Sequence, residues 1–211
     1  MPTYKAVDII KGFKKSMDDK ISNLPPDNDK KFYKEKKRQE EENTQKKIQD
    51  LVPKLYWKAK IDTSIIINPL NNFYLFGNPG TGKTHYTYAL QIDAIKNKKP
   101  THNRVYYPNT CNQYRNASFY DKEQILESLT TKPRLILDDL GSEPQSDANL
   151  EFLSTIINYR VENVLFLAFT SNLSIGKLPY SARIISRIAG LVGENKFEIK
   201  GTDRRLEINE K

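Results

Sequence analysis

Short apolar runs alternate with longer polar stretches along residues 65–211. Four of these runs predict strands: FYLF at 73–76, RVYY at 104–107, RLIL at 134–137 and VLFLAF at 164–169. The last run has no polar residue, which is typical of a strand that is buried on both faces of a parallel sheet. Two shorter alternating segments, FEIK at 197–200 and LEI at 206–208, predict further strands near the C-terminus.

The segments between these strands predict helices at residues 85–96, 121–129, 147–159 and 181–188. In the third segment, for example, leucine and isoleucine at positions 150, 153, 156 and 157 lie on one helical face. Strands that alternate with helices in this way are typical of an α/β domain. We expect that domain to occupy residues 51–211.

Residues 1–50 have a different pattern, which predicts a separate helical arm. Residues 1–24 carry apolar side chains every three to four positions, which indicates an amphipathic helix that ends at Pro25 and Pro26. Residues 27–50 have few apolar side chains and mixed charge, so they form either a solvent-exposed helix or a flexible linker. The amphipathic segment needs a surface to pack on, and either the core domain or a partner protein can supply it.

Most of the net positive charge lies in residues 1–60, which comprise this arm and the start of the core domain. The chain of 211 residues has a net charge of +8, and residues 1–60 hold 16 Lys and Arg against 10 Asp and Glu. Such an excess favours a polyanion or an acidic protein surface as the partner. A solvated charged helix explains the excess equally well.

Composition narrows the class of protein further. The single cysteine, Cys111, excludes an internal disulfide, and the isolated His85 and His102 are expected to be surface or helix residues rather than metal ligands. Neither a signal peptide nor a transmembrane run is visible. We therefore expect a cytoplasmic protein without a membrane partner.

The strand at 73–76 runs directly into a phosphate-binding motif. The sequence GNPGTGKT fits the P-loop pattern G-x-x-x-x-G-K-[ST], and it consists of Gly77, Asn78, Pro79, Gly80, Thr81, Gly82, Lys83 and Thr84. The glycines let several backbone N–H groups converge on one anion, and the following helix adds the positive end of its dipole. We expect Lys83 to reach the β- and γ-phosphates of ATP and the Thr84 hydroxyl to bind Mg²⁺.

Polar residues end the next two apolar runs. Asp138 and Asp139 follow the strand at 134–137, where a buried strand can deliver the first carboxylate beside Mg²⁺. The second carboxylate can then orient or deprotonate the attacking water. Asn172 closes the TSN segment after the run at 164–169, where a polar side chain can reach the γ-phosphate or the water.

Together, the segments GNPGTGKT, LILDDLG, TSNL and SARIISRI resemble the AAA+ ATPases, and among them the bacterial and phage helicase loaders of the DnaC/DnaI type and the IstB-like ATP-binding proteins. The weaker matches LVPKLYWKAKI at 51–61 and GTDRR at 201–205 support this narrower choice. The resemblance covers residues 51–208. It implies a five-stranded parallel sheet between helices, a short or absent C-terminal lid, ATP and Mg²⁺ as ligands, and ATPase activity.

The resemblance assigns a role to each polar residue that ends a strand. Asp138 becomes the metal-side carboxylate, Asp139 the water-activating carboxylate and Asn172 the sensor of the γ-phosphate. Most AAA+ proteins have Glu at the position of Asp139. The shorter side chain leads us to expect weak ATP hydrolysis that oligomerisation or DNA stimulates.

The resemblance also assigns roles to arginines near the C-terminus. Arg187 is the expected arginine finger for the ATP of a neighbouring subunit, with Arg183 as the alternative. A finger given in trans implies a homo-oligomer with ATP at the subunit interfaces. One of Arg204 and Arg205 is expected to act as a second sensor.

The segment before the strand at 134–137 contains a cluster of aromatic and basic residues. In the initiator and loader branch of the AAA+ proteins this region carries an extra helix that faces the central channel. The cluster offers aromatic faces for base stacking and cations for phosphates, and its candidate DNA-binding residues are Tyr114, Arg115, Phe119, Tyr120 and Lys122. The alternative is that Phe119 and Tyr120 are core residues of an ordinary helix.

These features favour an ATP-dependent loader that holds a hexameric replicative helicase through residues 1–50 and places it on single-stranded DNA in replication initiation. One alternative is a nucleotide-gated adaptor or inhibitor of the helicase with little hydrolysis. Another is an IstB-like transposition helper ATPase that acts on duplex DNA. A small-molecule P-loop kinase is disfavoured by the Asp138-Asp139 pair with the TSN segment and because the sequence shows no obvious arginine-rich lid for a phosphate acceptor.

Overall fold

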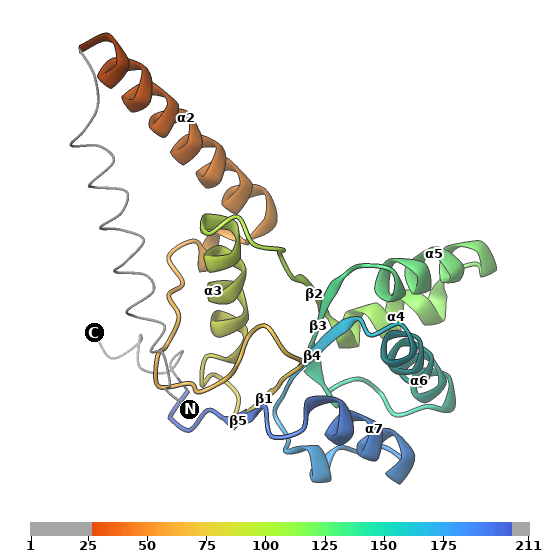
Figure 1. Cartoon of the computed structure of the whole chain (residues 1–211). Helices are drawn as coiled ribbons and strands as arrows, with labels where there is room; N and C mark the ends of the chain where they lie inside the picture. The colour runs from red at the N-terminus through yellow and green to blue at the C-terminus, as the bar shows by residue number, and fades with distance from the viewer. Residues whose placement is uncertain (1–26, 204–211) are drawn as a thin grey trace. The chain divides into compact units, whose positions relative to one another are not determined.

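The computed structural model describes residues 27–203 (Figure 1). The chain divides between Lys47 and Ile48 into two compact units. In the first unit, helix α2 (Asp27–Leu51) is the element described, and its last turn belongs to the second unit. Arg38 of this helix pairs with Glu35 at 2.6 Å and with Glu42 at 3.6 Å. Such pairs stabilise a helix that has few apolar side chains. Of the two forms predicted for residues 27–50, the structure shows the solvent-exposed helix rather than the flexible linker.

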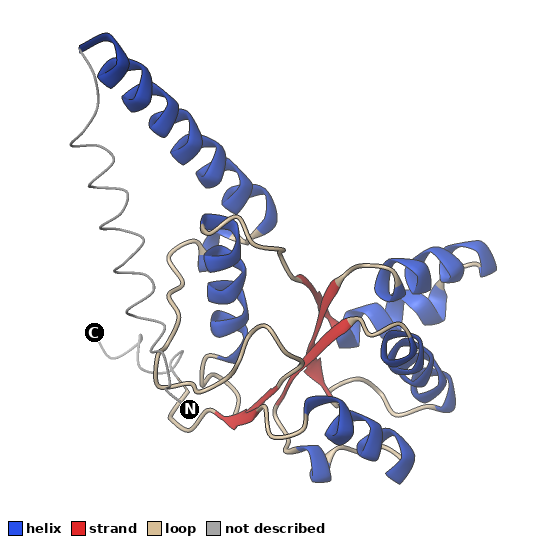
Figure 2. Cartoon of the chain, in the orientation of Figure 1, coloured by secondary structure: helices blue, strands red, loops and turns tan. Residues whose placement is uncertain are grey.

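The second unit is built on a parallel sheet of five strands. These are β1 (Tyr74–Phe76), β2 (Asn103–Tyr106), β3 (Arg134–Leu140), β4 (Phe166–Ser171) and β5 (Lys196–Glu198). Their order is β2-β3-β4-β1-β5, and every pair of neighbours is parallel (Figure 2). The predicted α/β fold with a five-stranded parallel sheet is therefore confirmed.

Helices cover both faces of the sheet (Figure 1). One face packs against α3 (Lys83–Lys96), and the other packs against α4 (Tyr107–Asn116), α5 (Phe119–Thr130), α6 (Asp147–Glu162) and α7 (Ala182–Val192). Two 3-10 turns, η1 (Lys54–Tyr56) and η2 (Ile175–Lys177), lie in the connections. Of the helices in residues 27–203, none is long and apolar enough to span a membrane.

Successive side chains along a strand pack into the two apolar cores on opposite faces of the sheet. On β3, Leu135 and Leu137 pack into the core on the side of α4 to α7, whereas Ile136 packs with Tyr86 and Leu90 of α3. Successive residues of a strand point to opposite faces, and both faces are covered here. This explains why residues 135–137 of β3 and 166–169 of β4 are apolar at successive positions.

Helix α4 is an element that the sequence pattern did not predict. The pattern predicts a strand through Tyr107, but α4 begins at Tyr107 with Pro108 in its first turn. Proline fits there because the first N–H groups of a helix have no partner within the helix. The Tyr107 ring is fully buried and stacks on Phe152 of α6.

Burial of two polar side chains, Arg160 and His102, was not predicted from the sequence. Arg160, near the end of α6, is fully buried, and its guanidinium donates to four backbone carbonyls at 2.5–3.3 Å, those of Leu129, Thr130, Pro133 and Phe166. The expectation that His102 is a surface or helix residue is wrong, because it lies in the loop just before β2 with 6% of its surface exposed.

Candidate functional site

The P-loop connects β1 to α3, as its sequence predicts. Gly80 and Gly82 have φ angles of 75° and 103°, a region that other residues enter only with strain, and Gly82 caps α3. Lys83 is the first residue of the helix and is buried. Its ammonium group donates to the carbonyls of Gly77 at 2.7 Å and Asn78 at 2.9 Å, so the side chain folds back over the loop.

The segment after β5 packs directly on this loop. A Cβ atom added to Gly80 would lie 1.8 Å from Oδ1 of Asp203, and one added to Gly77 would lie 2.2 Å from the Ile199 carbonyl oxygen. Close approach of the backbone therefore requires glycine at Gly77, whereas at Gly80 the φ angle requires it and the neighbour is a side chain. The sequence motif predicted the glycines but not their neighbours.

Asp138 lies at the centre of the polar groups beside the P-loop. Its side chain is almost fully buried near the end of β3. The Thr84 hydroxyl lies 3.3 Å from its Oδ2 atom, and the Thr170 hydroxyl donates to Oδ1 at 2.7 Å. The structure thus brings together the two residues that were predicted to bind Mg²⁺. A hydroxyl and a carboxylate are oxygen ligands of the kind that Mg²⁺ prefers, so these residues fit that ion.

Asp139 has a φ angle of 63°, in the left-handed region that aspartate tolerates better than most residues. The register between β3 and β4 shifts at this point. The Asp139 N–H donates to the Thr170 hydroxyl at 3.0 Å, and the Asn172 amide donates to its Oδ1 atom at 2.9 Å. The predicted water-activating carboxylate and the predicted sensor are therefore in direct contact.

Residues of β2 and α3 add a second set of contacts to the carboxylates. Arg104 pairs with Asp138, donates to the Tyr88 hydroxyl at 2.9 Å and stacks over the Tyr88 ring at 4.7 Å. On β2, Tyr106 is the partner of Asp138 in the strand register. Burial first, and then the negative charge of Asp139, raise the pKa of Tyr106. Sequence reasoning missed both residues, although the spacing of Arg104 and Tyr106 places them on one face of a strand.

The two candidate finger arginines on α7 have different environments. Arg187 is partly buried and donates to the Asn158 side chain on α6. Arg183 is exposed, and within residues 27–203 it has no hydrogen bond or ion pair. The candidates for the second sensor, Arg204 and Arg205, lie outside the described residues.

The candidate DNA-binding residues are distributed over α4 and α5. Tyr114 is partly buried, stacks on Phe152 at 4.0 Å and has the Lys122 ammonium 5.6 Å from its ring centre. Phe119 and Tyr120 begin α5 with 79% and 67% of their surfaces exposed, so they are not core residues. Arg115 is also exposed and donates to Asn112 at 3.1 Å. Their contact with DNA remains a prediction.

Three comparisons with known proteins agree with this geometry. Residues 14–181 match the family described as IstB-like ATP binding protein. The solved structure of DnaI has 30% sequence identity and a TM-score of 0.54 over 64% of this chain and 73% of that chain. The structure of the DnaC helicase loader has 29% identity and a TM-score of 0.51 over 70% of this chain and 100% of that chain.

A curated relative has no assigned role of its own. It is the uncharacterized protein YqaM of Bacillus subtilis (strain 168), which is 30% identical over 146 residues. The match covers 66% of this chain but only 45% of the length of YqaM.

Proposed function

The chain belongs to the IstB-like ATP-binding proteins, and from this membership we propose that it is an ATP-dependent loader of a hexameric replicative helicase onto single-stranded DNA. The observation that carries the proposal is the approach of Asp138 on β3 to Thr84 of the P-loop, in a chain similar to DnaI and the DnaC helicase loader. The loading activity comes from these similar proteins and is proposed here for this chain.

In the proposed mechanism, the P-loop and Lys83 bind the phosphates of ATP. Lys83 must leave the carbonyls of Gly77 and Asn78 to reach them, and it exchanges two neutral acceptors for charged ones. Thr84 and Asp138 would hold Mg²⁺, which neutralises charge on the phosphates during transfer. Asp138 is fixed for this task by the Thr170 hydroxyl.

Asp139 is the proposed base or orienting group for the attacking water. The Asn172 amide donates to one of its carboxylate oxygens at 2.9 Å and so helps to orient the group. The side chain is one methylene shorter than Glu, so we expect slow turnover. Slow turnover also fits the second candidate function, a nucleotide-gated adaptor or inhibitor of the helicase.

The proposed finger acts on the ATP of a neighbouring subunit in a homo-oligomer. Arg187 would first have to leave Asn158, whereas Arg183 is exposed on the same helix. Of the two arginines, Arg183 therefore needs less rearrangement to reach a neighbour. Replacing each with Ala and measuring turnover at increasing protein concentration distinguishes them, because loss of the finger removes the concentration-dependent part of the activity.

The proposed contact with the helicase uses residues 1–50, and a deletion can test it. The deletion should stop at Lys47, because Ile48 and Val52 are buried against Tyr88, Ala89 and Ile92 of α3. Full-length protein and this deletion are mixed with the replicative helicase of the same organism, in ATP and in ADP, and analysed for co-elution.

Co-elution that needs the arm and responds to nucleotide supports a helicase-bound function. The rate of ATP hydrolysis with and without single-stranded DNA then distinguishes a loader from an adaptor, because DNA is expected to stimulate hydrolysis only by the loader. If no complex forms in any nucleotide state, the helicase proposal fails. The IstB-like transposition helper then becomes the better reading, and duplex DNA becomes the ligand to test.

A further inference from the structure

Arg104 lies on the edge strand β2, where its side chain reaches the carboxylate of the proposed Mg²⁺ site. In the strand register Arg104 is the partner of Ile136 on β3, two residues before Asp138. Every second residue of a strand points to the same face, so Asp138 faces α3 as Ile136 does. The register between β2 and β3 therefore brings a cation to this carboxylate along one face of the sheet.

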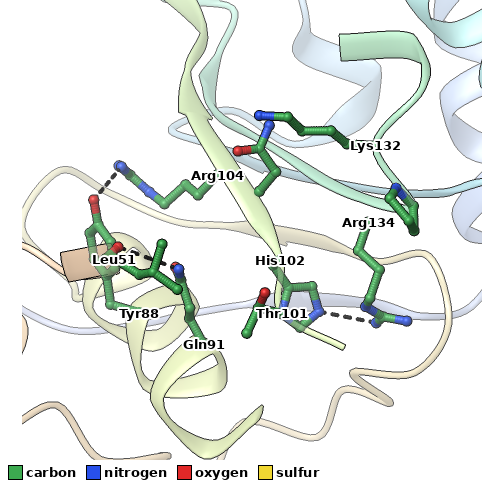
Figure 3. A pocket seen from close by; sticks show the side chains of 10 residues that line it. Leu51, Tyr88, Gln91, Thr101, His102, Arg104, Lys132 and Arg134 are labelled. Carbon is green, nitrogen blue, oxygen red and sulfur yellow. Dashed lines mark hydrogen bonds between the residues drawn. The ribbon is translucent and has the colours of Figure 1, made fainter. Parts of the chain in front are cut away.

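Both arms of the Arg104 guanidinium are held by protein groups. Its Nη2 atom pairs with Asp138, and its Nη1 atom donates to the Tyr88 hydroxyl of α3 at 2.9 Å (Figure 3). The guanidinium carbon also lies 4.7 Å from the centre of the Tyr88 ring, which is within cation–π distance. These contacts fix the guanidinium at the carboxylate and leave neither arm for a nucleotide.

Arg104 contacts the carboxylate oxygen that lies on the side of the P-loop. The Oδ1 atom of Asp138 accepts from the Thr170 hydroxyl at 2.7 Å. The Oδ2 atom lies 3.3 Å from the Thr84 hydroxyl, and it is the atom that pairs with Arg104. A cation that Thr84 and Asp138 bind together would have to share Oδ2 with the guanidinium or displace it. Arg104 and a metal ion are therefore rivals for the same oxygen.

Burial of the pair increases the effect of this rivalry. Only 13% of the Arg104 side chain and 3% of the Asp138 side chain are exposed. Salt and water screen a buried pair of charges much less than an exposed one. The guanidinium therefore offsets most of the negative charge that Asp138 would otherwise present to a cation, and it also repels that cation directly.

We propose that Arg104 competes with Mg²⁺ for Asp138 and thereby sets the Mg²⁺ concentration at which the chain binds ATP. Arg104 is a positioning residue in this scheme, because it acts through Asp138 and has no contact with the nucleotide. The inference rests on the nucleotide site of the proposed function, but it does not depend on helicase loading. Its consequence is that nucleotide binding by this chain responds to the concentration of free Mg²⁺.

Removal of the Arg104 charge tests this proposal. Arg104→Met keeps an apolar side chain against the Tyr88 ring and removes the guanidinium. The affinity of the full-length protein for AMPPCP is measured by calorimetry at increasing concentrations of Mg²⁺. In Arg104→Met, the Mg²⁺ concentration that gives half of the maximal effect should fall by about tenfold or more. At saturating Mg²⁺ the variant should bind AMPPCP at least as tightly as the unaltered protein does.

Three further variants control for charge, folding and position. Arg104→Lys keeps the charge and should keep the Mg²⁺ requirement close to that of the unaltered protein. Arg104→Gln keeps a donor for Asp138 without the charge, so it provides the same test if Arg104→Met does not fold. Arg134→Met removes another partly buried guanidinium, which lies 3.8 Å from the centre of the Phe166 ring. It lies at the start of β3 and should leave the Mg²⁺ requirement unchanged.

The outcomes separate this inference from the proposed function. If AMPPCP binding depends on Mg²⁺ but the charge-removing variants of Arg104 need as much Mg²⁺ as the unaltered protein, the inference alone is overturned. It is also overturned if these variants bind AMPPCP more weakly at saturating Mg²⁺ while Arg104→Lys does not, because Arg104 would then contact the nucleotide. If Mg²⁺ has no effect on AMPPCP binding by the unaltered protein, the proposed nucleotide site and the inference both fail.

Discussion

The Thr170 hydroxyl joins the two carboxylate residues of the site, and its removal should damage both. It donates to Asp138 at 2.7 Å and accepts from the Asp139 N–H at 3.0 Å, in a side chain that is 1% exposed. Thr170→Val keeps the shape of the side chain, so it removes the two hydrogen bonds without leaving a cavity. Each buried group that loses its partner costs about 1–3 kcal/mol. We expect a loss of about 2–4 kcal/mol in the free energy of unfolding.

The functional part of the prediction concerns Mg²⁺. Without Thr170, Asp138 loses the donor that fixes Oδ1, so the Mg²⁺-dependent part of the affinity for an ATP analogue should fall at least tenfold. Urea denaturation measures the stability, and titration of the analogue at several Mg²⁺ concentrations measures the affinity. Thr170→Ser keeps the hydroxyl and should restore the Mg²⁺ dependence.

Ser171 provides the matched control on the same strand. It is also buried, and its hydroxyl donates to the Leu140 carbonyl at 2.6 Å and accepts from the Leu173 N–H at 3.1 Å. Ser171→Ala should therefore cost stability but leave the Mg²⁺ dependence unchanged. The reasoning is refuted if Thr170→Val and Thr170→Ser bind the nucleotide with the same dependence on Mg²⁺.

Three further predictions concern other buried contacts. The pKa of His102 is about 4 in the fold against 6.5 for an unperturbed histidine, so unfolding takes up a proton between these values and stability falls as the pH drops. The loss in the free energy of unfolding amounts to about 3 kcal/mol by pH 4, and His102→Gln should lack it. Urea denaturation at pH 7, 5.5 and 4.5 measures this, and a pH profile that the substitution leaves unchanged would contradict the burial argument. Arg160→Met removes the guanidinium that donates to four backbone carbonyls and should cost about 3–5 kcal/mol in the same assay, more than Arg183→Met on the exposed face of α7. Gly80→Ala should weaken nucleotide binding strongly, because its Cβ would meet Asp203, and adding Asp203→Ala should restore part of the affinity; no restoration would mean that backbone strain alone is responsible.

The parts of the fold that local pattern controls could be predicted from the sequence. The P-loop is one contiguous motif between a strand and a helix, and the apolar runs placed four strands of the sheet within a few residues of their observed bounds. The start of α4 could not be predicted in this way, because RVYY reads as a strand and the turn into the helix depends on burial of Tyr107 against α6.

Long-range contacts account for the features that the sequence did not reveal. The role of Arg160 depends on carbonyls from three other segments, which no spacing along α6 can indicate. The pairing of Arg104 with Asp138 depends on the register between β2 and β3. Similarly, burial of His102 follows from the packing of Arg134 and Phe166 around it. The sequence pattern identified Asp138 and Asp139, but their hydrogen-bond partners could be identified only from the fold.

The ion pair of Arg104 and Asp138 also connects the proposed nucleotide site to a more distant part of the second unit. Arg104 rests on the Tyr88 ring, Tyr88 stacks on Tyr56 at 4.4 Å, and the cluster around Tyr88 includes Ile48 and Val52. An unbroken chain of contacts therefore runs from the carboxylate to the last turn of α2. We therefore expect a change in how Asp138 is held to alter the packing of Ile48 and Val52 through Arg104 and Tyr88.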